Sequence, residues 1–195
     1  MSILLVAGSA SERSRSAALL DAVAQRLRGR GATVERLRIR DLSPQALLLG
    51  DTDHRSIVAA LDSVARATAV VIATPVYKAA YSGVLKVFLD LLPQTGLQHK
   101  VVLPIATGGS PNHMLALDYA LRPVLQSLAA RHILPGVYAT DSQVILLPEG
   151  THHLSLDIAQ RLDDATGVLL QESGRGVASG ASFQPVPFSM VRCSV

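Results

Sequence analysis

The 195-residue chain has no tryptophan, a single cysteine, Cys193, and only 4% aromatic residues. One cysteine cannot form an internal disulfide, and it cannot supply the Cys-x-x-Cys pairs that hold zinc or iron–sulfur clusters. No apolar run approaches the roughly 20 residues that a membrane-spanning helix needs. The apolar run Ile3–Ala7 is too short for the core of a signal peptide and has no basic residue before it. We therefore expect a cytoplasmic protein with no metal centre and no membrane segment.

Charge is also sparse, because Asp, Glu, Lys and Arg make up 17% of the chain and the formal net charge is +3. The arginines gather between Arg26 and Arg40, and no aromatic residues interleave with them. Single-stranded nucleic acid is usually bound by basic and aromatic side chains together. A solvated helix face followed by an edge strand explains these arginines better, and we expect no nucleic-acid partner.

Two common nucleotide motifs are missing. The chain has neither the Gly-Lys-Ser/Thr of a Walker A loop nor the Gly-x-Gly-x-x-Gly fingerprint of a dinucleotide-binding fold. No pattern of acid, base and nucleophile stands out either. The pair His152–His153 and the nearby Glu149 are expected to be solvated or capping groups rather than metal ligands.

Hydrophobic residues make up 49% of the sequence, enough for one domain with a sizeable core. Apolar, β-branched runs alternate with helical patterns along the chain. The expected strands are Ile3–Ala7, Thr33–Arg40, Ala69–Ala73, Lys100–Ala106 and Ile133–Ala139. Helices are expected between and after them, over about 16–28, 54–67, 84–92, 114–130 and 151–172, with an irregular connection over 41–53.

This alternation predicts an α/β fold, a doubly wound five-stranded parallel sheet with helices on both faces. The flavodoxin-like strand order 2-1-3-4-5 fits it. We predict one domain over residues 1–172. The Gly-, Ser- and Pro-rich residues 173–195 are predicted to form a tail, either flexible or laid on a neighbouring subunit.

Two prolines predict local irregularity. Pro104 falls inside an expected strand, where it removes a ladder donor. Pro123 falls inside the apolar pattern of the expected helix 114–130, and its ring clashes with the carbonyl four residues back, that of Tyr119. The helix is therefore expected to kink or to contain a π-bulge at that point.

The predicted strand order brings three exit loops together. The first loop, Gly8–Ser16, carries serine hydroxyls and arginines at a helix N-terminus, a place that attracts anions such as a phosphate monoester. The second loop, Pro75–Gly83, begins with a proline that fixes its own φ angle and restricts Thr74 before it, which suits a rigid loop. The glycines of the third loop, Thr107–Asn112, allow the backbone to approach a flat ligand closely. Together they describe a flavin mononucleotide (FMN) site, although each loop alone could equally be a cap or a turn.

The same segments resemble a known family. The run Ala73-Thr-Pro-Val-Tyr-Lys-Ala-Ala-Tyr-Ser-Gly83 is its most specific part. Further matches, in order along residues 1–170, are Ala7–Ser9, Ser14–Ser16, Leu91–Pro93, Lys100–Pro104, Ala106–Gly109, His113, Asp118–Leu121, Pro123–Leu125 and Asp141–Val144. The chain resembles the NADPH-dependent FMN reductases of flavodoxin-like fold, in particular the reductase component of two-component alkanesulfonate monooxygenase systems.

The resemblance implies which residues hold the flavin. The phosphate would lie on Ser9, Ser14, Arg15 and Ser16. The isoalloxazine ring would lie against Pro75, Val76, Tyr77, Lys78, Ser82, Gly83, Thr107, Gly108, Gly109 and Ser110. Ser11 stands where many members have an arginine, so that either Arg13 or Arg15 compensates or phosphate binds less tightly.

The resemblance also implies an activity: hydride transfer from NADPH, or from NADH, to FMN, with reduced FMN passing to a partner monooxygenase. It implies a homo-oligomer, a dimer or a tetramer. Tyr119 would lie in a π-helical insertion at the tetramer interface and would modulate flavin release. No acid or base is needed for hydride transfer, because the cofactors carry the chemistry.

Two rival functions remain open at this stage. One is a flavoenzyme that retains FMN and reduces quinone or azo compounds. The other is a non-enzymatic electron carrier of the flavodoxin type, against which the basic charge balance argues, because such carriers usually present an acidic surface. Retention of flavin during purification separates both rivals from an enzyme that uses flavin as a substrate.

Overall fold

Two hydrophobic clusters, one on each side of a parallel sheet, organise the fold in the computed structural model, which describes residues 2–175. The first half of the chain contains β1 Ser2–Ala7, α1 Arg15–Gly29, β2 Thr33–Arg38, the 3-10 turn Ile39–Asp41, α2 Pro44–Leu49, α3 Arg55–Arg66, β3 Ala69–Tyr77, β4 Ala80–Tyr81 and α4 Gly83–Asp90. The second half contains β5 Val101–Gly108, the 3-10 turn Pro111–His113, the π-helix Ala116–Leu121, α5 Arg122–Ser127, β6 His132–Ile133, β7 Val137–Thr140, β8 Val144–Leu146, β9 His152–Leu154 and α6 Leu156–Arg175.

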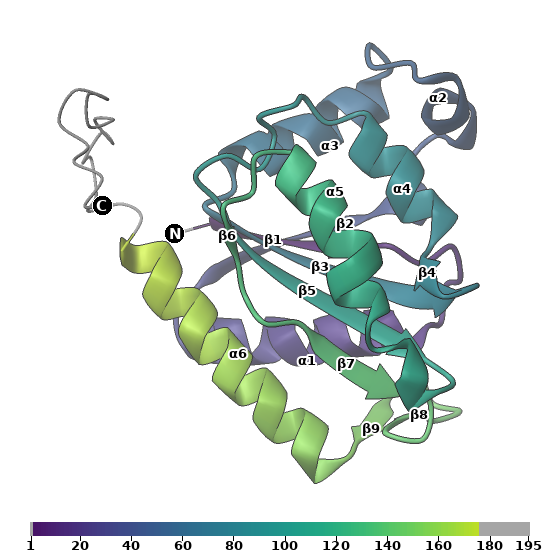
Figure 1. The fold of residues 1–195 in the computed structure, drawn as a ribbon, viewed down its shortest axis with the longest axis vertical. Helices are drawn as coiled ribbons and strands as arrows, with labels where there is room; N and C mark the ends of the chain where they lie inside the picture. Colours follow the sequence, from purple (N-terminus) through teal and green to yellow (C-terminus); the bar gives the residue numbers. More distant parts are fainter. Residues whose placement is uncertain (1, 176–195) are drawn as a thin grey trace, which may run out of the picture.

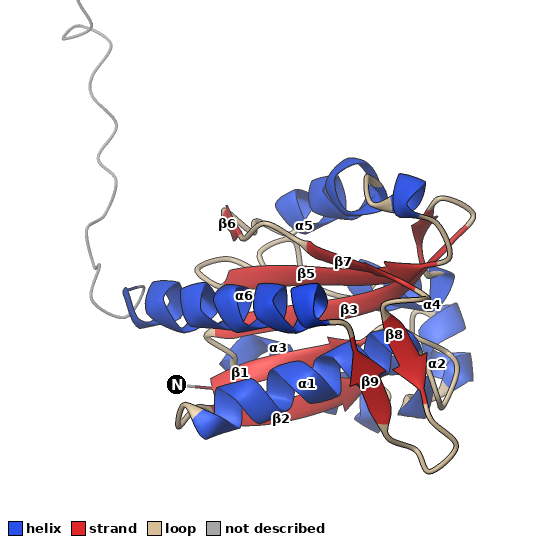
Figure 2. Ribbon diagram, turned by 90° about the horizontal axis from the view of Figure 1, so that it is seen from below, coloured by secondary structure: helices blue, strands red, loops and turns tan. Residues whose placement is uncertain are grey.

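The parallel sheet has the order β2-β1-β3-β5-β6, and β7 runs beside β5 beyond the end of β6. Because β6 and β7 are the two parts of the predicted fifth strand, the predicted order 2-1-3-4-5 is confirmed. Figure 2 shows α1 and α6 on one side of the sheet and α2, α3 and α4 on the other. The prediction of helices on both faces is also confirmed.

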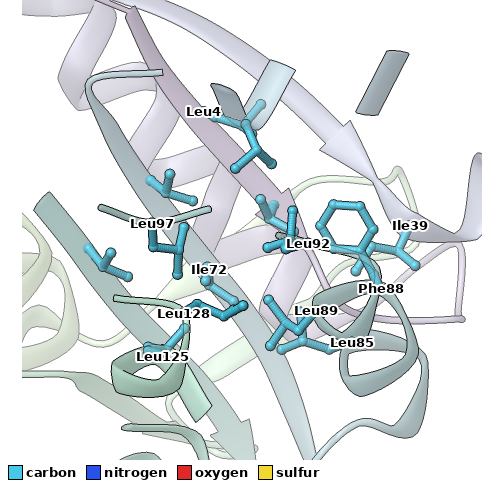
Figure 3. Packing of buried hydrophobic residues seen from close by; sticks show 14 of the residues in the cluster. Leu4, Ile39, Ile72, Leu85, Phe88, Leu89, Leu92, Leu97, Leu125 and Leu128 are labelled. Carbon is cyan, nitrogen blue, oxygen red and sulfur yellow. The ribbon is translucent and has the colours of Figure 1, made fainter. Parts of the chain in front are cut away.

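The core on the α3, α4 and α5 side is built mainly from aliphatic residues, together with the buried rings of Phe88 and Tyr138, which are 1% and 6% exposed. Figure 3 shows Leu85, Phe88 and Leu89 of α4 lying together with Ile39, while Leu125 and Leu128 approach Ile72 of β3. The spacing of Leu85, Phe88 and Leu89 places all three on one helix face. In the described part of the chain, no helix is long and apolar enough to span a membrane.

The break between β6 and β7 lies beside Pro104. The Leu134 N–H donates to the Val102 carbonyl at 2.9 Å, so Val102 faces the outer strand. Alternate residues of a strand face the same neighbour, and Pro104 therefore presents its missing donor to that strand as well. β5 itself continues through Pro104. The predicted irregularity thus falls in the neighbouring strand, and the predicted strand Ile133–Ala139 is interrupted over 134–136.

The segment predicted as a loop after Ala73 is partly strand. β3 continues to Tyr77 because Pro75 and the residue before it both favour extended backbone. Pro75 pairs in register with Thr107 of β5, and Val76 pairs antiparallel with Tyr81 of β4. The hairpin turns at Lys78 and Ala79, whose φ angles are 51° and 63°, as a tight primed turn requires.

The π-helix confirms the irregularity predicted from Pro123. The Arg122 N–H bonds to the Leu117 carbonyl, five residues back, at the junction with α5. The wider turn moves the chain away from the clash that Pro123 would otherwise make with the carbonyl of Tyr119. Figure 1 shows this stretch leading into α5 near the carboxyl end of β5.

Two other expectations were wrong. The predicted irregular connection 41–53 contains α2, whose start and end carry ordinary signals: Ser43 is the N-cap, Pro44 follows it, and Gly50 ends the helix with φ 68°. The predicted helix 151–172 begins only at Leu156, because His152–Leu154 pair with β8 in a two-stranded hairpin. Of the predicted tail, residues 173–175 continue α6 and residues 176–195 lie outside the described part.

Candidate active site

The predicted exit loops of the first, third and fourth strands meet at the carboxyl edge of the sheet. Figure 1 shows this edge where the arrowheads of β3, β5 and β7 converge near β4 and β8. A cavity of about 300 Å³ opens here, at the lower end of the range for small-molecule sites. It is lined by Ser11, Arg13, Ser14, Arg15, Pro75, Val76, Tyr77, Thr107, Gly108, Gly109, Asp141 and Leu146.

The first loop forms a polar cradle at the start of α1. Ser14 is the N-cap, and its hydroxyl accepts from the Ala17 N–H at 3.1 Å and lies 3.3 Å from the Ser16 hydroxyl. Ser9 accepts from the Ser11 N–H at 3.1 Å. The first N–H groups of a helix, its positive dipole end and nearby hydroxyls together suit an anion.

Two arginines of this loop reach across to the segment between β7 and β9. Arg15 donates from Nε to the Val144 carbonyl at 3.1 Å, and its Nη1 lies 3.5 Å from Oδ2 of Asp141. The Arg13 guanidinium donates to the Leu147 carbonyl. The side chains of Arg15 and Asp141 are 41% and 48% exposed, so solvent screens their attraction.

Ser82 ties the first loop to the second. Its hydroxyl donates to the Gly8 carbonyl and accepts from the Leu85 N–H at 3.3 Å, which caps α4. The Ser82 N–H donates to Oγ1 of Thr74 at 3.0 Å. Ser82 is 2% exposed, so its hydroxyl holds the chain in place and does not face the cavity.

The third loop is shaped by Tyr138 of β7. The Tyr138 hydroxyl donates to the Ser110 carbonyl at 2.6 Å. Burial, with the Asp141 carboxylate adding to it, raises the pKa of the Tyr138 phenol, so this donor stays protonated at neutral pH. A Cβ on Gly108 would collide with the same hydroxyl oxygen. With the Tyr138 hydroxyl in this position, glycine fits where β5 ends and alanine would not.

The residues predicted to bind flavin divide into two groups. Ser14, Arg15, Pro75, Val76, Tyr77, Thr107, Gly108 and Gly109 line the cavity. The others lie in the surrounding segments: Ser9, Ser16, Lys78, Ser82, Gly83 and Ser110. Lys78 is in the turn of the β3–β4 hairpin, and Ser110 caps the next 3-10 turn through the Asn112 N–H at 3.3 Å.

Sequence reasoning did not assign Asp141 or Leu146 to the site. Both follow β7, whose carboxyl end lies at the same edge of the sheet. Extending the rule that ligands bind at the carboxyl ends of parallel strands to the fifth strand would have pointed to Asp141.

The donor set fits FMN. A helix N-terminus with hydroxyls and two guanidinium groups suits the phosphate, and the backbone edges at Pro75–Tyr77 and Thr107–Gly109 leave space for a flat ring. In residues 2–175 no group of three or more His, Cys, Asp or Glu is arranged to hold a metal ion.

Comparison with known proteins agrees with this donor set. The family model described as NADPH-dependent FMN reductase matches residues 1–144. The chain belongs to this family. It is therefore an FMN reductase, an oxidoreductase whose redox partners are FMN and a nicotinamide nucleotide.

Individual relatives cover nearly the whole of this FMN reductase. An FMN reductase (NADPH) of Pseudomonas putida strain KT2440 is 45% identical over 92% of the chain and 93% of its own length. An FMN reductase (NADPH) of Escherichia coli K12 is 44% identical over 85% of the chain and 86% of its own length. The crystal structure of apo NADH:FMN oxidoreductase (EMOB) is 36% identical with a TM-score of 0.78, over 93% of this chain and 91% of that one.

Proposed function

We propose that this FMN reductase takes hydride from NADPH, with NADH as an alternative donor, passes it to FMN as a substrate, and releases reduced FMN to a partner monooxygenase of the sulfonate-assimilation type. The observation that carries the proposal is the cavity in which an anion-binding helix N-terminus and two backbone edges face each other. Family membership supports the reaction, and the sequence run Ala73–Gly83 supports the sulfonate-type branch.

The residues of the cavity have separate tasks in this proposal. Ser14, Arg15 and the N-terminus of α1 hold the phosphate, as hydroxyl and charged donors. Pro75–Tyr77 and Thr107–Gly109 bracket the ring and fix its orientation. The bound flavin supplies the hydride-accepting chemistry. None of these residues has to act as an acid or base, so their role is to bind and orient the flavin.

The openness of the site supports flavin as a substrate rather than a retained cofactor. The Tyr77 residue is 57% exposed and the Arg15 side chain 41% exposed. A ligand bracketed by such residues stays partly hydrated, so that burial contributes less to its binding.

An exposed apolar surface supports the proposed homo-oligomer, a dimer or a tetramer. Met114, Leu115 and Tyr119 lie on and before the π-helix and are 52%, 54% and 79% exposed. Exposed large apolar side chains that gather in one place commonly mark an interface between proteins. We propose that Tyr119 lies in this interface and modulates flavin release from the neighbouring site.

A Tyr119→Ala variant is expected to purify yellow, with FMN retained and little reduced flavin released. Loss of the ring would alter the packing next to the flavin site, and the measurement is the visible spectrum of the purified protein with its flavin content. Leu156→Ala, at another exposed apolar residue, 89% exposed at the start of α6, is the control and should stay colourless. A colourless, fully active Tyr119→Ala protein would contradict the role of Tyr119.

The proposed function is tested by the oxidation of NADPH and of NADH, with and without added FMN, on protein whose bound flavin has been quantified. Oxidation that depends on added FMN, by protein that arrives nearly flavin-free, is the expected result. If FMN arrives bound and only a quinone or azo acceptor accelerates turnover, the retained-flavin function is correct instead. If no acceptor supports turnover, the site serves binding alone.

A further inference from the structure

The Asp141 carboxylate occupies an unexpected place for an anion-binding site. It lines the same cavity as the phosphate cradle, with Oδ2 3.5 Å from Nη1 of Arg15. The same oxygen also lies near the third loop, because a Cβ atom added to Gly109 would be 3.9 Å from it. The negative charge therefore lies between the loop proposed for the phosphate and the loop proposed for the ring.

Hydrogen bonds hold Asp141 and its segment in this position. The Asp141 N–H donates to the Gly108 carbonyl at 3.1 Å, which anchors the residue to the end of β5. Two residues on, Gln143 accepts from the Thr140 N–H at 2.9 Å and donates to Asp157 at 2.9 Å. The segment after β7 is thus tied both to β5 and to the start of α6. These bonds hold the backbone that carries the Asp141 carboxylate at the edge of the cavity.

We propose that Asp141 sets the affinity for flavin by competing with the flavin phosphate for Arg15. This rests on the proposed function, in which Arg15 holds the phosphate. Without flavin, Asp141 neutralises Arg15. When a phosphate dianion binds, Arg15 turns from one anion to the other, and the carboxylate remains nearby as a like charge that opposes binding.

The consequence fits an enzyme that must release its flavin. A built-in competitor weakens the phosphate contacts without removing any of the groups that orient the ring. Flavin is then positioned while bound and is still able to leave. Asp141 acts through Arg15 and through its charge, so it is a positioning and affinity-setting residue and not a catalytic one.

The test is equilibrium binding of FMN and of riboflavin, which has the same ring and no phosphate, to the wild type and to Asp141→Asn. Asparagine keeps the shape of the side chain and the backbone bond to Gly108. We expect Asp141→Asn to bind FMN about tenfold more tightly, because one like charge near a dianion is removed. Riboflavin affinity is expected to change by less than about twofold, because the removed charge has no counterpart on that ligand.

Four further measurements sharpen this test. Asp62→Asn removes the same charge from an exposed position on α3 and is expected to leave both affinities unchanged. The gain from Asp141→Asn should shrink in an Arg15→Gln background, and it should decrease with rising salt, as for charges that solvent reaches. Asp141→Ser also removes the negative charge at this position, with a smaller side chain, and should tighten FMN binding in the same way.

Two results would overturn the inference. Weaker FMN binding by Asp141→Asn would mean that the carboxylate holds the flavin directly. An equal gain for FMN and riboflavin would mean that Asp141 acts on the shape of the ring site. Because binding is measured without a nicotinamide nucleotide, a protein that fails to oxidise NADPH but still shows the FMN-specific gain would contradict the proposed function and support the role of Asp141.

Discussion

Replacing Gly108 with alanine is expected to weaken FMN binding by roughly 10- to 100-fold, because the edge of β5 that would face the ring must move, and overpacking costs of about 1–3 kcal/mol correspond to affinity losses of this size. The new methyl group would collide with the Tyr138 hydroxyl oxygen, which is itself held by the Ser110 carbonyl at 2.6 Å. Overpacking of this kind also lowers the free energy of unfolding by roughly 1–3 kcal/mol. Fluorescence titration of FMN and urea unfolding measure the two effects.

A double variant shows whether the collision is the cause. Without the hydroxyl, the next atoms near the added Cβ are Cζ of residue 138 and Cβ of Val76, both at 3.4 Å. Tyr138→Phe should therefore restore most of the stability and FMN affinity of Gly108→Ala. Gly29→Ala, where nothing lies within 4 Å of the added methyl, is the matched control. If the double variant were as weak as Gly108→Ala, the collision would not be the explanation.

Ser82→Ala is expected to lower the free energy of unfolding by about 2–4 kcal/mol, the sum of a lost helix cap and a buried carbonyl left without its partner. The cap is the bond from the Leu85 N–H, and the carbonyl is that of Gly8. Because Ser82 is 2% exposed, water cannot replace either bond without rearrangement. Urea unfolding followed by circular dichroism measures the loss.

Ser43→Ala separates the two contributions. Ser43 caps α2 by accepting from the Ala46 N–H at 3.3 Å, at a half-buried position, so its replacement should cost only the cap, about 1 kcal/mol. An equal loss for Ser82→Ala and Ser43→Ala would show that the bond to Gly8 contributes nothing. The same comparison tests whether Ser82 joins the first and second loops.

The parts of this fold that follow from local patterns could be read from the sequence. Continuous apolar runs, one alternating segment and helical patterns of period 3.6 located the strands and the main helices, and the parallel order then placed three exit loops at one edge. The irregularity at Tyr119 followed from the geometry of a single residue, Pro123. In each case the information lies within one turn or one strand of the residue concerned.

The parts that depend on distant contacts could not be read in this way. From the sequence, a serine before a helix can equally be a cap or a ligand-binding residue. In the structure the Ser82 hydroxyl caps α4 and bonds to the Gly8 carbonyl. Asp141 meets Arg15 only because the fifth strand ends beside the first loop. The hairpin of β8 and β9 was missed because its strands have three residues each, too few to show a period.

The interruption of the outer strand beside Pro104 has a consequence for how the protein behaves in a crowded solution. An uninterrupted edge strand presents a row of free amide and carbonyl groups, with which a strand of another molecule can pair. Here the edge strand is divided into β6, with two residues, and β7, with four. Each piece is too short to dock a foreign strand in stable register. A proline in the neighbouring, interior strand thus protects this side of the sheet against fibril-like growth.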